Sequence, residues 1–323
     1  MVMTKSKDAA PVTGRARTQL LADIGRDHFL RGKSKVQIAE DRGLSRFQVA
    51  NLLQEALDRG IVRISIHLPD AEADAGLAAA LGIARVVTVG TDGGPARGED
   101  LARAVAGTIV RTVAPGDTVG IAWSRTLQAA VRELPPMPTC AFVQLSGAIS
   151  TDQDAAGPRL LAALEARAVW PLWAPLVVSD AVALRASPEI RTTLEHAHDL
   201  DVAVIAVGRW KEGFSTVWDR VPPAGQRAAL RAGAVAEISG RLLDAHGHAV
   251  DSPVENMVVA ATLEQMAGAR HTIAVSHGAE RAVAALAAVR AGLIDTLVCD
   301  LDLHEALADL LAKERLVSGS AGQ

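Results

Sequence analysis

A serine, an arginine and a threonine stand directly after an apolar run that is typical of a buried strand. In DTVGIAWSRTLQAAV the apolar run ends at Trp123, and a helical pattern begins at Thr126. Ser124, Arg125 and Thr126 are therefore expected at a helix N-terminus, where backbone N–H groups, the helix dipole and two hydroxyls can hold an anion. The alternative is an ordinary Ser/Thr cap beside a loop arginine.

A second polar turn ends the next apolar run, in CAFVQLSG. It contains Gln144, and Gly147 there permits close approach of a backbone. Open α/β sheets bind ligands at the edge where the carboxyl ends of their strands meet. We therefore expect this turn to open at the same sheet edge as Ser124.

The spacing of the histidines and glycines argues against a metal site and against a nucleotide-cofactor site. His196 and His198 are two residues apart, so on a helix they face different sides. The stretch His246-Gly-His248 has no cysteine or carboxylate cluster beside it. The glycines of GTDGGPARG lack the spacing of a dinucleotide fingerprint, and no phosphate-loop lysine motif occurs. We expect no metal and no cofactor.

The first fifth of the chain carries a different chemistry, because it is basic while the rest is acidic. Residues 1–63 hold 12 Lys and Arg against 7 Asp and Glu, net +5, and the remainder holds 21 against 30, net −9. This asymmetry favours a polyanionic partner for the N-terminus alone. Ser34 can cap the helix KVQIAEDR, and Ser45 can cap the longer helix RFQVANLLQEALDR. Two capped helices joined by a tight turn at Gly43 are typical of a helix-turn-helix.

In helix-turn-helix docking, the first turn of the second helix faces the bases. Arg46, Gln48 and Asn51 are therefore expected to contact base edges, with Arg favouring guanine and Gln and Asn favouring adenine. The alternative is a three-helix packing module with a solvated polar face. The DNA-binding set is completed by residues at the two helix starts, mostly for phosphate contacts: Lys33, Ser34, Lys35, Gln37 and Ser45.

The elements that position these residues change in type along the chain. An amphipathic helix is expected from Thr18 to Arg31, and IVRISIHL alternates like a strand. From Leu77 onward, apolar runs such as ARVVTVG, DVAVIAVG and AVAEISG alternate with Ala- and Leu-rich helices, a pattern that favours a mostly parallel sheet covered on both faces. The expected fold is α/β, a small helix-turn-helix domain followed by a Rossmann-like, mostly parallel αβα domain.

The expected domain limits follow from composition. Residues 1–17 are expected to form a flexible arm, 18–67 the helix-turn-helix domain, and 68–318 an effector-binding and oligomerisation domain. No window approaches the apolar length of a membrane span, and the N-terminus lacks the apolar stretch of a secretory signal. We therefore expect a cytoplasmic protein without a membrane partner.

The chain resembles the SorC-type transcriptional regulators, which respond to sugars or sugar phosphates. The resemblance lies in QIAEDRGLSRFQVANLLQEALDRGIVRISI and in the ordered blocks GDTVGIAWSRTL, FVQLSGAI, PLWAPLVV, DVAVIAVG, GAVAEISGRLLDAHG and LIDTLVCD. It runs from about Thr18 to Leu311. It implies an effector domain related in fold to glucosamine-phosphate deaminases and ribose-phosphate isomerases, used for binding rather than catalysis, and assembly as dimers or tetramers.

The resemblance adds four effector-binding candidates. Glu237 stands where the family usually has Asp, and Arg241 matches a frequent Arg. His277 replaces one glycine of a Gly-rich turn, and Arg281 replaces the lysine after it. A carboxylate can accept bonds from sugar hydroxyls, and arginine can clamp an anion. Ser124 stands where the family commonly has Gly.

These observations predict a DNA-binding transcriptional regulator, not an enzyme. A small sugar, polyol or sugar phosphate would control its affinity for double-stranded operator DNA. The alternative is a sugar-phosphate isomerase- or deaminase-like enzyme with a fused DNA-binding domain. A Schiff base needs a desolvated lysine, for which only Lys211 lies near a strand end, and an isomerase base could be Glu237 or Asp300. A third reading is a DNA-binding protein whose large domain only oligomerises.

Overall fold

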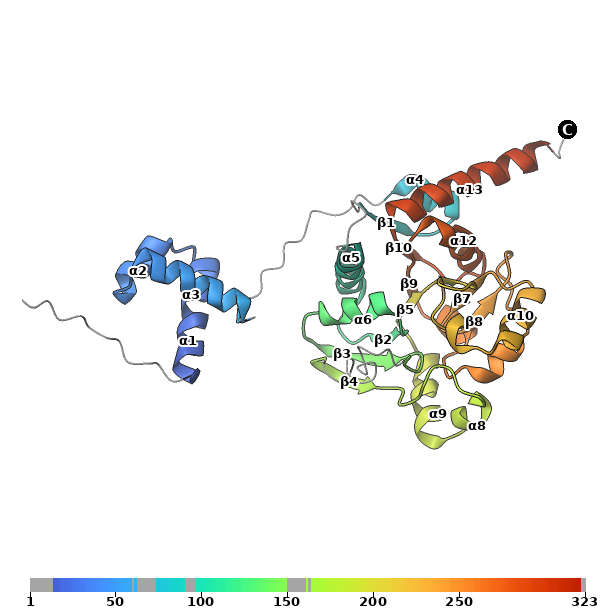
Figure 1. The fold of residues 1–323 in the computed structure, drawn as a ribbon, viewed down its shortest axis with the longest axis horizontal. Coiled ribbons are helices and arrows are strands. Elements are labelled where there is room, and N and C mark those ends of the chain that lie inside the picture. Colours follow the sequence, from blue (N-terminus) through green and yellow to red (C-terminus); the bar gives the residue numbers. More distant parts are fainter. Residues whose placement is uncertain are drawn as a thin grey trace, which may run out of the picture. The chain divides into compact units, whose positions relative to one another are not determined.

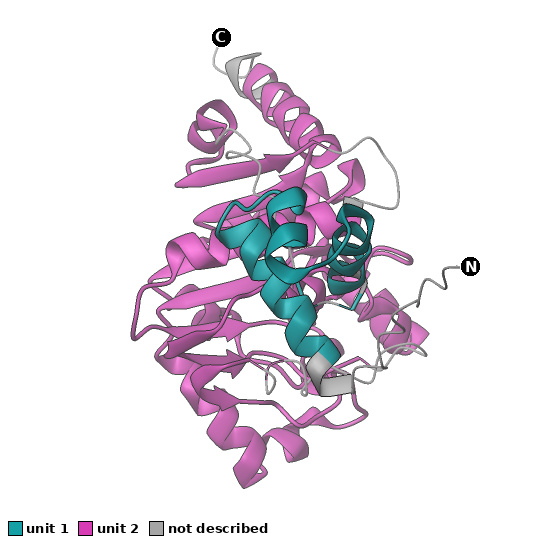
Figure 2. Cartoon of the chain, turned by 90° about the vertical axis from the view of Figure 1, so that its left-hand side faces the viewer, with its two compact units in different colours: residues 1–69 teal, residues 70–323 magenta. Residues whose placement is uncertain are grey.

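The computed structural model describes residues 14–59, 61–62, 74–90, 97–149, 161 and 164–320. The chain divides into two compact units, Met1–Pro69 and Asp70–Gln323 (Figure 2), which are described separately here. This division falls two residues from the boundary expected after residue 67. Within the described ranges, no helix combines the length and the apolar character that a bilayer span requires.

The N-terminal unit consists of three helices and a π-helical turn. Helix α1 (Gly14–Gly25) continues into that turn (Arg26–Leu30), and the last two helices form the helix-turn-helix: α2 (Lys35–Arg42) and α3 (Arg46–Asp58). Gly43 adopts φ +63° between them, the left-handed conformation that ends α2. Their buried residues form one small core: Leu21, Ile24, Ile38, Ala39, Val49, Leu52, Leu53 and Ala56.

The prediction of a flexible arm over residues 1–17 is wrong for residues 14–17, which belong to a helix. Helix α1 begins at Gly14, and the Arg17 guanidinium donates to the Glu55 carboxylate of α3 over 2.6 Å, which holds the first helix against the third. Residues 1–13 lie outside the described part of the chain. So does most of the strand expected at IVRISIHL, whose first two residues, Ile61 and Val62, form a bend.

The larger unit is built on a seven-stranded, fully parallel sheet (Figure 1) in the order β1-β10-β9-β5-β2-β3-β4. Near-continuous apolar runs form these strands because both faces of the sheet are buried. The strands are β1 (Arg85–Val89), β2 (Thr118–Ile121), β3 (Met137–Gln144), β4 (Ala166–Trp170), β5 (Val202–Ala206), β9 (His271–Val275) and β10 (Thr296–Asp300).

Helices cover both faces of this sheet, with α5 and α6 on one face and α12 and α13 on the other (Figure 1). The expected α/β class, with a small helical N-terminal part and a mostly parallel αβα part, is confirmed. The helices of the larger unit are α4 (Ala75–Leu81), α5 (Arg97–Thr112), α6 (Arg125–Arg132), α8 (Ala181–Arg185), α9 (Pro188–Glu195), α10 (Pro223–Arg231), α11 (Leu263–Ala267), α12 (Ala282–Arg290) and α13 (Leu301–Ser320).

AVAEISG is a strand, but it does not belong to the parallel sheet. It forms β7 (Ala236–Ile238) in a separate antiparallel sheet with β6 (Gly208–Arg209) and β8 (Arg241–Leu243). The reason is the tight turn after it, where Ser239 (φ +52°) and Gly240 (φ +81°) reverse the chain into a hairpin.

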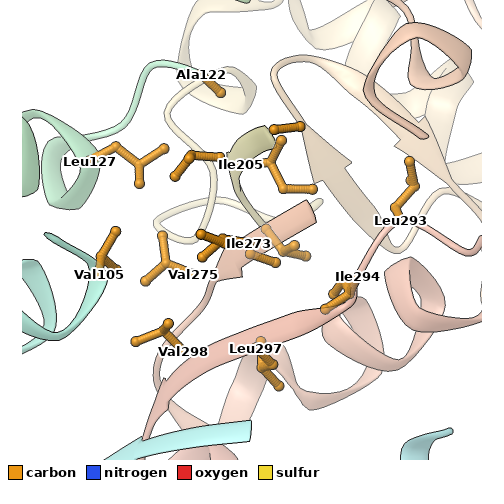
Figure 3. Close-up of a cluster of buried hydrophobic side chains, with 14 of the residues drawn as sticks. Val105, Ala122, Leu127, Ile205, Ile273, Val275, Leu293, Ile294, Leu297 and Val298 are labelled. Carbon is orange, nitrogen blue, oxygen red and sulfur yellow. The ribbon is translucent and has the colours of Figure 1, made fainter. Parts of the chain in front are cut away.

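Alternating side chains of the central strands build the main core on both sides of the sheet. In Figure 3, Ile273 and Val275 of β9 lie among the buried residues, while the neighbours Leu297 and Val298 of β10 point to opposite faces. Val298 shares its side of the sheet with Val105 of α5. This core fixes the strand ends that carry the polar residues.

The strand order reverses between β2 and β5. Strands β3 and β4 extend the sheet on one side of β2, whereas β5, β9 and β10 extend it on the other. Open α/β sheets form a ligand-binding crevice at the carboxyl ends of the strands where the order reverses. The segments that follow β2, β5 and β9 therefore frame the place to look for a site.

Candidate functional site

Ser124 begins helix α6 immediately after β2. Its hydroxyl accepts a hydrogen bond from the Leu127 N–H over 3.0 Å. Ser124 is therefore a helix cap, as the alternative interpretation of this turn predicts. The cap leaves the N–H groups of Arg125 and Thr126 without partners inside the helix. These groups and the exposed Arg125 side chain lie at the carboxyl end of β2. The turn therefore presents positive charge and donors together.

Arg281 brings a second guanidinium to the same region from beyond β9. It donates to the carbonyl of His277 over 2.7 Å, and it lies 5.3 Å from the ring centre of Phe214. Burial lowers the pKa of the Arg281 guanidinium, the Asp300 carboxylate acts in the opposite direction, and the positive charge of Arg125 lowers that pKa further. The positive charge of Arg125 therefore acts on Arg281.

Glu237 lies beside the end of β5, because its strand β7 pairs with Gly208, two residues past that end. Its carboxylate accepts bonds from the Ser215 hydroxyl, over 3.0 Å, and from the Gly240 N–H. Only 7% of the residue is exposed. Burial raises the pKa of the Glu237 carboxyl, and these two donors act in the opposite direction. A buried carboxyl whose pKa is raised is a candidate functional-site residue.

Arg241 is engaged within the protein. It is 3% exposed, and its guanidinium donates to the carbonyls of Ala260 and Ala261 and to the Glu255 carboxylate. In the β7–β8 register Arg241 pairs with Ile238. The structure therefore gives this expected effector-binding residue internal partners for its guanidinium.

Gln144 and Gly147 also have internal roles. The Gln144 amide donates to the Ser146 carbonyl over 2.8 Å and accepts from the Leu172 N–H over 3.2 Å. A Cβ atom on Gly147 would lie 2.6 Å from the backbone of Pro175, so a neighbouring segment makes the close approach. His277 is half-buried, and its carbonyl orients Arg281.

Sequence reasoning singled out Lys211 in the segment 208–215 but missed three of its other residues. Ser215 holds Glu237, Phe214 lies against Arg281, and Arg209 donates to the carbonyl of Glu280 over 3.3 Å. The segment GRWKEGFS follows an apolar strand, which is the available sequence signal. That it lies at the carboxyl ends of the strands where the order reverses depends on the strand order, a property that no local pattern reports.

The expected DNA-binding residues lie at the starts of α2 and α3, which share one pattern. SKVQIAE and SRFQVAN each begin with a capping box, in which the serine accepts from the glutamine N–H and the glutamine accepts from the serine N–H. The boxes are Ser34 with Gln37 and Ser45 with Gln48. Both glutamines therefore position helix starts with their side-chain oxygens.

The charged and polar residues around these boxes differ in how freely they can meet DNA. Lys35, Arg46 and Asn51 are exposed, whereas Lys33 donates to the Asp41 carboxylate over 2.7 Å. An amide needs both its oxygen and its nitrogen to pair with adenine. Asn51 meets that requirement more readily than Gln48, whose oxygen is bonded to the Ser45 N–H.

Comparison with known proteins decides what these two regions belong to. A family model described as "Putative sugar-binding domain" matches residues 68–308, which is most of the larger unit. The chain belongs to the SorC-type family of sugar-binding transcriptional regulators.

Relatives of this regulator match along nearly the whole chain. The deoxyribonucleoside regulator of Bacillus subtilis is 27% identical, over 91% of this chain and 99% of its own length. The sorbitol operon regulator of Klebsiella pneumoniae is 24% identical, over 90% of this chain and 97% of its own length. The crystal structure of full-length SorC from Klebsiella pneumoniae shares the fold, with a TM-score of 0.63 and 20% identity over 90% of this chain and 98% of that one.

The resemblance expected from the sequence is thereby confirmed, as is the function of an effector-controlled, DNA-binding transcriptional regulator. The isomerase alternative is not favoured, since the relatives are named as regulators. Lys211, the residue proposed for a Schiff base, is exposed, with its ammonium 5.3 Å from the Phe214 ring centre. In the described ranges of this SorC-type regulator, no group of three or more His, Cys, Asp or Glu side chains could hold a metal ion.

Proposed function

We propose that this regulator binds a small sugar, polyol or sugar phosphate in the crevice framed by the start of α6 and by the segments after β5 and β9. The observation that carries the proposal is the start of α6, where exposed Arg125 stands beside the backbone N–H groups that the helix leaves without partners. Arg281, after β9, adds a second positive charge whose field reaches Arg125, and such an edge favours an anionic partner. A phosphorylated or otherwise acidic sugar fits this arrangement best.

The rest of the crevice suits the neutral part of such a ligand. Glu237 and Ser215 offer oxygen atoms that sugar hydroxyls can bond. Phe214 supplies an apolar ring beside the arginine. We place the anionic group at Arg125, Thr126 and Arg281, and the hydroxyl groups toward Glu237.

The N-terminal unit would bind duplex DNA through the second helix of its helix-turn-helix. Arg46 and Asn51 would contact base edges, and Lys35 would contact a phosphate. One short recognition helix supplies few base contacts, so we infer that the protein binds its operator as a dimer or tetramer.

We infer that the regulator does not turn over the sugar that it binds. A Schiff-base lysine is activated when it is desolvated, and Lys211 is exposed. The buried carboxyl of Glu237 is the group that could serve as the base of an isomerase. An activity assay therefore tests the inference. Isomerase and deaminase assays of the purified protein on pentose and hexose phosphates should give no turnover, and activity that Glu237→Gln abolishes would contradict the inference.

Calorimetry with a panel of free and phosphorylated pentoses and hexoses tests the proposed site. For a phosphorylated ligand, Arg281→Ala and Thr126→Ala should each weaken binding by about 1.5–3 kcal/mol, the scale of a hydrogen bond to a charged group. Arg227→Ala is the matched control, because Arg227 is exposed on α10. Full affinity in the Thr126→Ala, Arg281→Ala double variant would place the ligand elsewhere.

A further inference from the structure

Phe47 presents its ring to solvent on the first turn of α3. It is 82% exposed, whereas the apolar residues Val49, Leu52 and Leu53 of the same helix are buried. A single exposed apolar side chain is common on protein surfaces, so the place of this ring on the helix decides what it can contact. The core of the N-terminal unit does not use this ring.

The position of Phe47 on the helix points to the kind of contact. Phe47 and Asn51 are four residues apart, so their side chains are neighbours on one exposed face of α3. Asn51 is the residue on this face whose amide suits adenine, and Arg46 precedes Phe47 with an exposed positive charge. The ring therefore lies within a surface that is otherwise polar and suited to base edges.

Helix α2 begins with the same pattern but offers a different surface. Val36 and Glu40 of α2 stand where α3 has Phe47 and Asn51. Both Glu40 and Val36 are exposed. A carboxylate is repelled by DNA phosphates, so α3 rather than α2 suits the groove.

We propose that Phe47 reads the 5-methyl group of a thymine in the major groove of the operator, in the base pair that Asn51 contacts or the one beside it. The proposal rests on the DNA-binding function proposed above. Thymine presents an apolar group in the major groove, and contact with phenylalanine is one way in which proteins read it. An adenine read by Asn51 is paired with a thymine, so one base pair can satisfy both residues.

The test compares thymine with uracil, which differ only by this methyl group. The full-length protein first selects duplexes from a library with a randomised core, and the enriched duplex is then resynthesised with deoxyuridine at one thymine position at a time. At one position in each half-site, uracil should weaken binding by about fourfold, the scale of leaving one methyl group unburied. Phe47→Ala should bind the thymine and uracil duplexes equally.

Two further variants separate this role from others. Leu30→Ala is the matched control, because Leu30 is 80% exposed in the same unit but belongs to the π-helical turn, and it should keep the wild-type ratio. Phe47→Leu should keep part of the ratio, since leucine also contacts a methyl group. A thymine-to-uracil ratio that Phe47→Ala leaves unchanged would overturn the proposal. The proposal would also be overturned if Phe47→Ala lost the same affinity for both duplexes and changed its oligomeric state. That result would assign Phe47 to contact with a second copy of the chain. If no duplex is enriched, the proposed DNA-binding function itself fails.

Discussion

Glu237 and Arg241 are four residues apart in the sequence, yet they face opposite sides of the β7–β8 hairpin. Glu237 pairs with Leu242, and Arg241 pairs with Ile238. Successive pairs of a hairpin point to opposite faces, so the two side chains lie on different faces. Glu237 turns toward Ser215 beside the end of β5, while Arg241 bonds to the carbonyls of Ala260 and Ala261. Glu237 is therefore held by a side-chain hydroxyl after β5, and Arg241 by backbone carbonyls on the other side of the hairpin.

Arg241→Ala should lower the stability of the larger unit. The buried carbonyls of Ala260 and Ala261 would lose their donors, at a cost of about 2–4 kcal/mol in the free energy of unfolding. Urea denaturation followed by tryptophan fluorescence measures this change, with Arg227→Ala as the exposed control. Unchanged stability together with lost sugar binding would instead make Arg241 a ligand-binding residue.

The stability of the larger unit should depend on the protonation of Glu237. Burial raises the pKa of this carboxyl above the usual glutamate value. Between those two pKa values the folded state holds a proton that the unfolded state has lost, so the free energy of unfolding falls as the pH rises. Glu237→Gln should remove this fall. Denaturation at a series of pH values tests it, and the exposed Glu264→Gln control should keep the wild-type slope.

Lys35 and Lys33 should differ in their contribution to DNA binding. Lys35 is exposed at the start of α2, whereas Lys33 already pairs with Asp41. Lys35→Ala should weaken binding to all duplexes and reduce the slope of log K against log salt by about one. Lys33→Ala should change the slope less. Titrations over several salt concentrations measure both, and equal slopes for the two variants would contradict this difference.

Local signals made the helix-turn-helix predictable from sequence. Ser34, Gly43 and Ser45 act on their immediate neighbours, and the structure places α2 and α3 where these caps required. The paired role of Gln37 and Gln48 was also present in the spacing Ser-x-x-Gln, although the sequence reading assigned both to DNA contact. A capping box joins two residues that are three positions apart in the sequence, so sequence alone can report it.

Non-local relationships were harder to predict. Apolar runs located the strands, but the position of β7 beside the segment after β5 depends on its pairing with Gly208, which lies far from Glu237 in sequence. For the same reason Ser215 and Phe214 were not recognised. Arg241 was expected to bind ligand because it matches an arginine that is frequent in the family, whereas the carbonyls that it bonds are fixed only by the fold.

Asp27 should control the acid stability of the N-terminal unit. It is 4% exposed and accepts bonds from Arg42 over 2.8 Å and from Arg31 over 2.9 Å. The hydrogen bond from Arg42 lowers the pKa of the Asp27 carboxyl most, the bond from Arg31 lowers it further, and burial acts in the opposite direction. The stabilisation is therefore present above the usual aspartate pKa and is lost as the pH falls through the lowered value.

Asp27→Asn should weaken the N-terminal unit at neutral pH and flatten this acid dependence, because an amide keeps no charge for the two arginines. Hydrogen–deuterium exchange of the α1–α3 amides, corrected for the intrinsic effect of pH, measures the opening of this unit within the full-length chain. Asp23→Asn is the matched control, since Asp23 lies on α1 and bonds Arg26 at a more exposed position. If both variants exchange alike, the pairs of Asp27 with Arg31 and with Arg42 of α2 do not stabilise the unit. If only Asp27→Asn opens it, the same loss should appear as weaker binding to every duplex, because α3 would no longer be held in place.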